Sequence, residues 1–214
     1  MRRVFLAAVA AMCLSAPAGA VILGISPAEF SPDVFATTPT GAVLATIGPS
    51  TFVSSGGPGD FVGHYTETAI SDPGNVFGAG DVTILVNITS TAGANDIGRV
   101  TASDFGAFGL VDVGYVLGLG NTPTTVDRTT GGPVGFNFVD QIAAGDSTDT
   151  LVIETPGRFV APGGLSMIND NTSDNPGLSA AVPELSTWVM ALLGFGMLAF
   201  AARAKARHPH TIFG

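Results

Sequence analysis

Short apolar runs, separated by glycine, proline, asparagine and aspartate, fill residues 21–178 of the chain. In residues 61–70 the side chains alternate with the period of two that is typical of a strand with one buried face. One predicted face carries Phe61, Gly63, Tyr65, Glu67 and Ala69, and the other carries Val62, His64, Thr66, Thr68 and Ile70. Residues 82–89 (VTILVNIT) are rich in β-branched side chains and predict a buried strand. Further strands are predicted at 108–117, 134–142 and 148–154.

Turn-forming sequences separate these predicted strands. They are Asp72-Pro73-Gly74-Asn75, Gly78-Ala79-Gly80-Asp81, Gly131-Gly132-Pro133 and Ala144-Gly145-Asp146. Each combines residues that favour chain reversal. No stretch longer than ten residues between the two ends of the chain shows a convincing helical period. Many short strands joined by turns predict an all-β domain, namely an antiparallel β-sandwich, with a β-barrel as the alternative.

The middle of the chain is strongly acidic. Residues 21–182 contain sixteen acidic and three basic residues, a net formal charge of −13. Such a surface is repelled by phosphates, so nucleic acid is not expected as a partner. The single cysteine, Cys13, lies in the first twenty residues. If those residues are removed, the chain has no disulfide, no thiol nucleophile and no cysteine-ligated zinc.

Residues 1–20 have the features of a signal peptide. Arg2 and Arg3 precede an apolar run, residues 4–14, that is too short to cross a bilayer as a helix. Small residues at Ala18 and Ala20 then match the needs of a signal peptidase. We expect cleavage after Ala20, with cleavage after Ala18 as the second choice. A short membrane anchor is the alternative.

The C-terminal part of the chain has four successive features. Residues 169–182 are polar and rich in turn formers, which predicts a linker. Residues 185–202 are apolar and uncharged for eighteen positions, which predicts a transmembrane helix. The basic residues Arg203, Lys205 and Arg207 follow, before a short tail at 208–214, and should remain in the cytoplasm. Trp188 stands at the opposite end of the apolar stretch, where an aromatic ring contacts lipid headgroups.

Residues 183–207 resemble the PEP-CTERM sorting signal in its PEP-x-x-W-A form. The matching positions are Pro183, Glu184, Trp188, the Leu192-Leu193-Gly194-Phe195-Gly196 run, Arg203, Lys205 and Arg207. Leu185 stands where a second proline is usual, and Val189 where alanine is usual. The resemblance implies recognition by an exosortase, removal of the tail and delivery to the cell exterior of a Gram-negative host that makes exopolysaccharide. A plain single-pass anchor is the alternative.

The middle domain, residues 21–168, also resembles the ectodomains of other small PEP-CTERM proteins. The similar phrases are Tyr65-Thr66-Glu67-Thr68 and Leu151-Val152-Ile153-Glu154-Thr155. This resemblance implies a fold and a destination, and it implies no particular chemistry.

Catalytic constellations are not evident in the middle domain. His64 is its one histidine, it lies in mid-strand, and no GxSxG elbow occurs in the chain. The three glutamates before the tail are Glu29, Glu67 and Glu154. A glycosidase would need two carboxyl groups about 5–10 Å apart across a cleft, and nothing in the pattern brings Glu67 and Glu154 together. We therefore predict no catalytic residues and no enzyme.

Two groups of oxygen-bearing residues could bind Ca²⁺. One is Asp72, Asn75 and Asp81, and the other is Asn169, Asp170, Asn171 and Asp174. Neither group has the spacing of an EF-hand loop or of a calcium-binding repeat. Ordinary turn formation is the expected role of both groups, so no metal or cofactor site is predicted.

These observations predict an exported structural protein of the cell surface or extracellular matrix. Its expected partners are signal peptidase and an exosortase during export, the inner membrane before processing, and extracellular polysaccharide afterwards. A carbohydrate-binding module is the alternative, which a line of exposed aromatic side chains on one sheet face would favour. A secreted hydrolase is the third hypothesis, which would need Glu67 and Glu154 in one cleft.

Overall fold

The computed structural model describes residues 22–24, 26–54, 60–129 and 132–181, together with the isolated positions 193, 195 and 197. The chain divides into two compact units, residues 1–181 and residues 182–214, and the strands described below belong to the first. In the described ranges, no helix has both the length and the apolar character needed to span a membrane. The predicted signal peptide lies outside the described residues, as do the named residues of the sorting signal other than Leu193 and Phe195.

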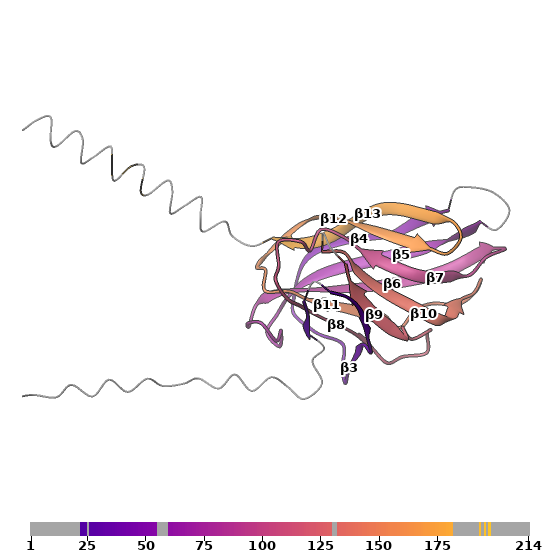
Figure 1. Cartoon of the computed structure of the whole chain (residues 1–214), viewed down its shortest axis with the longest axis horizontal. Coiled ribbons are helices and arrows are strands. Elements are labelled where there is room, and N and C mark those ends of the chain that lie inside the picture. Colours follow the sequence, from indigo (N-terminus) through magenta and orange to yellow (C-terminus); the bar gives the residue numbers. More distant parts are fainter. Residues whose placement is uncertain are drawn as a thin grey trace, which may run out of the picture. The chain divides into compact units, whose positions relative to one another are not determined.

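The first unit is built from two β-sheets (Figure 1). Sheet A has the order β1-β8-β11-β6-β5-β4, and β3 also pairs with β8. Its strands are β1 (Ile22–Leu23), β3 (Asp33–Phe35), β4 (Ala42–Val53), β5 (Phe61–Asp72), β6 (Asp81–Gly93), β8 (Val111–Val116) and β11 (Thr150–Glu154). Sheet B has the order β13-β12-β7-β10-β9-β2. Its strands are β2 (Ser26–Phe30), β7 (Ile97–Ala102), β9 (Thr125–Arg128), β10 (Val134–Ile142), β12 (Phe159–Ile168) and β13 (Thr172–Ala181).

Every strand pair is antiparallel except β3 with β8, which confirms the prediction of an all-β, antiparallel architecture. Apolar side chains from both sheets form one hydrophobic core, an arrangement consistent with a β-sandwich. The core includes Val86 and Ile153 of sheet A and Val100, Phe136 and Leu165 of sheet B. Burial of these β-branched and aromatic side chains supplies the main driving force for packing the sheets together.

The alternation in β5 sets the orientation of that strand. Phe61, Tyr65 and Ala69 belong to the core, as the period of two predicts. Glu67 lies in the same set and is completely buried. Ile70, which was predicted on the opposite face, is buried as well.

Predicted strand boundaries agree with the structure to different extents. The predicted strand at 134–142 coincides with β10, whereas the predicted strand at 108–117 shortens to β8. The expectation of a polar linker over 169–182 is wrong, because residues 172–181 form β13 and pair along their full length with β12. The folded unit therefore extends to Ala181, beyond the predicted boundary at residue 168.

Candidate functional site

A pocket of about 480 Å³ lies against one end of sheet A. Its walls are β3 with the following segment 36–40 and the turn that begins at Pro73. Asp112 of β8 and Glu154 of β11 also line it. These two residues are paired in register and lie on the same face as Thr83, the partner of Glu154 in β6. Since Val82 and Ile84 point into the core, the pocket is on the outer face of sheet A.

Four carboxylates line this pocket, namely Asp33, Asp72, Asp112 and Glu154. Glu154 is only 4% exposed, and its Oε2 atom accepts a hydrogen bond from the backbone N–H of Val76 at 2.9 Å. Burial is the main cause that raises the pKa of Glu154 to about 7. The neighbouring carboxylates Asp112, Asp72 and Asp33 act in the same direction, and the hydrogen bond from Val76 acts in the opposite one. The pocket can therefore accept hydrogen bonds, and its charge changes near neutral pH.

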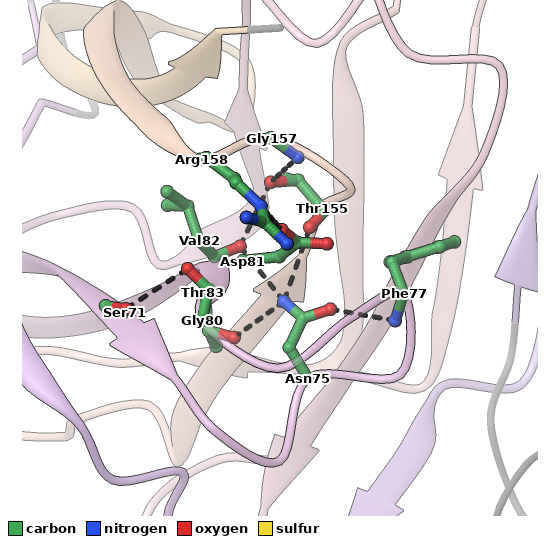
Figure 2. Close-up of polar contacts among 10 residues, drawn as sticks. All are labelled: Ser71, Asn75, Phe77, Gly80, Asp81, Val82, Thr83, Thr155, Gly157 and Arg158. Carbon is green, nitrogen blue, oxygen red and sulfur yellow. Dashed lines mark hydrogen bonds and ion pairs between the residues drawn. The ribbon is translucent and has the colours of Figure 1, made fainter.

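The turn beside the pocket is held by the buried amide of Asn75 (Figure 2). Its Nδ2 atom lies within hydrogen-bond distance of the carbonyl oxygens of Val82 and Thr155, at 3.2 and 3.3 Å, and of Thr83 Oγ1 at 3.1 Å. Its Oδ1 atom accepts the backbone N–H of Phe77 at 2.9 Å. One side chain thus connects the turn to β6 and to the residue that follows β11.

Asp72 stabilises the same turn through both oxygens of its carboxylate. Its Oδ1 atom accepts the backbone N–H of Gly74 at 2.7 Å, and its Oδ2 atom accepts the hydroxyl of Thr83 at 2.9 Å. Asp81 lies at the other end of the turn and forms an ion pair with Arg158 at 3.0 Å (Figure 2). Asp72, Asn75 and Asp81 therefore all form contacts that shape the turn.

Residues of both oxygen-bearing groups form hydrogen bonds within the protein. No three His, Cys, Asp or Glu side chains in the described part of the chain are placed to hold a metal ion. In the second group, Asn169 donates to the carbonyl oxygen of Asp96, and Asp174 accepts the hydroxyl of Ser166. These contacts fix the β12–β13 hairpin and its neighbour.

Glu67 and Glu154 do not share a cleft. Glu67 pairs with Val86 of β6 and points into the core, whereas Glu154 pairs with Thr83 and points outward. Positions 83 and 86 lie on opposite faces of β6, because side chains alternate along a strand. The hydrolase hypothesis required the two carboxyl groups together, and the fold places them on opposite faces of sheet A.

His64 is an exposed side chain on β5. Its Nδ1 atom lies 3.2 Å from the Oγ1 atom of Thr51 on the neighbouring β4. This is a surface contact between two adjacent strands, and among the described residues no acidic partner is hydrogen-bonded to the imidazole. The arrangement offers no serine-type triad.

Sequence reasoning missed the role of Arg128, which is fully buried at the end of β9. Its Nη2 atom donates to the carbonyl oxygens of Phe105 and Phe108, each at 2.6 Å. Its Nη1 atom donates to the carbonyl oxygens of Leu23 and Gly109 at 3.3 and 3.2 Å. Burial lowers the pKa of Arg128 from its ordinary value. The guanidinium therefore has a structural role, because its hydrogen bonds connect β1 to the turn at residues 105–109.

Exposed aromatic side chains do not form a line across either sheet in the described ranges. The exposed large aromatic residues there are Phe30 on β2 and Phe159 on β12. These strands are separated by β7, β10 and β9 in sheet B. The feature that would favour a carbohydrate-binding platform is therefore not present on these faces.

Comparison of the chain with protein-family models, with curated proteins and with solved structures finds no match in any of the three.

Proposed function

We propose that this chain is an exported protein of the cell surface or extracellular matrix, delivered by a C-terminal sorting signal that an exosortase reads. Its role is structural and is associated with exopolysaccharide or biofilm. The proposed architecture is a β-sandwich ectodomain, flanked before processing by a signal helix and by a transmembrane helix at 185–202. The domain is first held in the periplasm by that helix and then moves to the cell surface or the medium.

The position of the last strand carries this proposal. β13 ends at Ala181, and the sorting motif begins two residues later at Pro183. Removal of the tail at the motif would therefore leave every described strand intact. At the other end, β1 begins at Ile22, two residues after the expected cleavage at Ala20. Both expected processing positions fall in sequence just before β1 and just after β13, and cleavage at such positions would spare the described strands.

The acidic surface supports the same destination. A domain with a net formal charge of −13 over residues 21–182 stays soluble and avoids anionic lipid. The described part contains two ion pairs, Arg99 with Asp127 and Arg158 with Asp81. The acidic residues that are not buried give an acidic surface, which suits a hydrated matrix outside the cell.

The test is expression of the full chain in a host with and without its exosortase, followed by fractionation and intact-mass measurement. In the presence of the enzyme we expect a released species that lacks residues 1–20 and the region after about residue 183. A Pro183→Ala/Glu184→Ala double variant should remain in the inner membrane, and a Ser186→Ala variant is the matched control. If the Arg203–Arg207 end stays attached in both hosts, the tail is only an anchor and the proposal is wrong.

A further inference from the structure

The terminal strand β13 is an edge strand of sheet B, and it lies next to β4 and β5 of sheet A (Figure 1). In the register of the hairpin, Leu178 is opposite Pro162, and Pro176 is opposite Gly164. A proline has no N–H, so these two pairs cannot exchange hydrogen bonds between the strands. The backbone groups of Pro176 and Leu178 consequently point away from β12, toward the open edge.

Two side chains of β5 bind these edge groups. The hydroxyl of Tyr65 donates to the carbonyl oxygen of Pro176 at 2.8 Å. The Oε2 atom of Glu67 accepts the backbone N–H of Leu178 at 2.8 Å. Tyr65 and Glu67 are two residues apart on β5, and their partners Pro176 and Leu178 are two residues apart on β13. Successive core-facing side chains of β5 therefore meet successive backbone groups at the free edge of β13. Two side chains of sheet A thus satisfy backbone groups at the free edge of sheet B.

The half of the hairpin nearest Ala181 has few other hydrogen bonds to its neighbours, and it contacts the core through Leu178 and Ala180. β12 pairs with β7 only through residues 165–168, so residues 159–164 lie beyond that ladder. The further hydrogen bonds are from the Ser103 N–H to the carbonyl oxygen of Gly164, and from the Ser179 hydroxyl to the carbonyl oxygen of Asp104. An element with few backbone bonds to its neighbours can open without global unfolding.

We propose that Tyr65 and Glu67 form a clasp on β13, and that this clasp loosens as the pH rises through neutrality. The element that opens is the part of the hairpin formed by residues 159–164 and 176–181. Its opening gives water access to the carboxyl group of Glu67 and frees the strand that leads into residues 182–214.

Glu67 is the pH-sensitive part of this clasp. It is 0% exposed, and its Oε1 atom has no hydrogen-bond partner in the described residues. Burial raises its pKa to about 7, while the hydrogen bond from Leu178 acts in the opposite direction. The protonated group is therefore tolerated in the core, whereas the ionised group gains hydration only when the hairpin opens.

No charged side chain faces Glu67 from the elements packed around it in the described chain. β4 and β12 contain no titratable residue, and the one titratable residue of β6, Asp81, lies five positions from the partner of Glu67. Asp174 of β13 is exposed and bound to Ser166, and Arg99 of β7 is bound to Asp127. The group that faces Glu67 is Tyr65, whose own pKa is raised by burial and, to a smaller extent, by Glu67.

Hydrogen exchange with mass spectrometry on the full-length chain in mild detergent tests the clasp. Exchange is measured at pH 6 and pH 8 and corrected for the chemical exchange rate. If opening returns Glu67 to its ordinary pKa of 4.5, the open population rises about tenfold between these two pH values. Peptides covering residues 159–164 and 176–181 should lose protection by that factor, and peptides from the centre of β6 should not.

Three variants separate the clasp from general destabilisation. Glu67→Gln keeps the shape and removes the charge, so its hairpin protection should be the same at both pH values. Tyr65→Phe should lower protection at both values and retain the tenfold difference. Glu154→Gln removes a similar carboxyl group on the opposite face and should leave the hairpin unaffected. Equal protection of the wild type at pH 6 and pH 8, or an unchanged pH difference in Glu67→Gln, would overturn the proposal.

Discussion

Glu67 and Glu154 lie on opposite faces of sheet A, and each is buried without a cation beside it in the described chain. Glu67 points into the core between the sheets, and Glu154 points into the pocket beneath β3. Burial is the first cause of the raised pKa of both groups, each to about 7. The separation rules out a two-carboxylate site made from this pair, and it gives the protein two independent groups that titrate near neutral pH.

The first prediction concerns the pH dependence of stability. Since Glu154 has a folded-state pKa of about 7 and an ordinary pKa of 4.5, the folded state binds more protons than the unfolded state between these values. The free energy of unfolding therefore falls as the pH rises from 4.5 to 7, and levels off above 7. Glu154→Gln should match the wild type near pH 4.5 and exceed it at pH 8 by about 1–2 kcal/mol, allowing for solvent at the pocket mouth. Urea unfolding at both pH values measures this difference.

The carboxyl group with a lowered pKa, Asp127, does not interfere with that measurement. The hydrogen bond from Arg99 lowers the pKa of Asp127 below its ordinary value of 3.8. The stability it contributes is present above that value and is lost only in more acidic solution. A Glu154→Gln variant that gains nothing between pH 5 and pH 8 would contradict the first prediction.

The second prediction concerns Arg128. Arg128→Met removes one donor from each of four carbonyl oxygens, those of Leu23, Phe105, Phe108 and Gly109. Phe105 keeps the N–H of Phe108 and Gly109 is exposed, but buried carbonyls that lose a donor are costly, so we expect the free energy of unfolding to fall by about 3 kcal/mol. Arg158→Met is the matched control, because its side chain is 65% exposed and its ion pair should contribute less than about 1 kcal/mol. Equal effects of the two substitutions in denaturant unfolding would refute this account.

The third prediction concerns Asn75. Asn75→Asp cannot donate to the carbonyl oxygens of Val82 and Thr155, and it adds a buried charge beside Asp72. We expect a loss of about 3 kcal/mol or more at pH 7, and a smaller loss at pH 4, where the new carboxyl group is protonated. Thermal unfolding followed by circular dichroism measures both values. The control Asn87→Asp, on an exposed position of β6, should change stability by less than about 1 kcal/mol.

The fourth prediction concerns the end of the folded unit. A chain that ends at Ala181 should fold with the same far-UV spectrum and unfolding midpoint as the released species expected from the proposed function. A chain that ends at residue 171 lacks β13. Without Leu178, the core residues that it covers are exposed to solvent, and β12 becomes an unpaired edge strand, so this chain should be unstable or aggregate. A stable, monomeric product from the shorter chain would show that β13 is dispensable.

Hydrophobic alternation placed Phe61, Tyr65, Glu67 and Ala69 on one face of β5, and these residues are all buried in the structure, because a period of two leaves little freedom in a paired strand. The bounds of β10 also follow from its pattern. β13 was missed because an edge strand exposes one face and one edge, so its sequence is as polar as a linker. Asn169-Asp170-Asn171 is a hairpin turn between two strands that have almost no apolar alternation.

The candidate site was predicted less completely. Asp72 and Asn75 were identified as turn residues, and they do shape the turn beside the pocket. The pocket itself depends on β3 and segment 36–40, whose placement over β8 comes from long-range pairing that no local pattern encodes. Arg128 was missed for a related reason, since a charged residue at the end of a short strand ordinarily indicates exposure.

The first strands of the chain have a consequence for the order of folding. β1 and β3 pair with β8, and β2 between them pairs with β9, so residues 22–35 pass from one sheet to the other and back. Their partners lie in residues 111–128, far later in the chain. In a chain that emerges N-terminus first, residues 22–35 emerge early. They can form their strand pairs only after residues 111–128 have followed. Until then their strand edges stay unpaired, and unpaired strand edges are the surfaces most prone to aggregate with other chains.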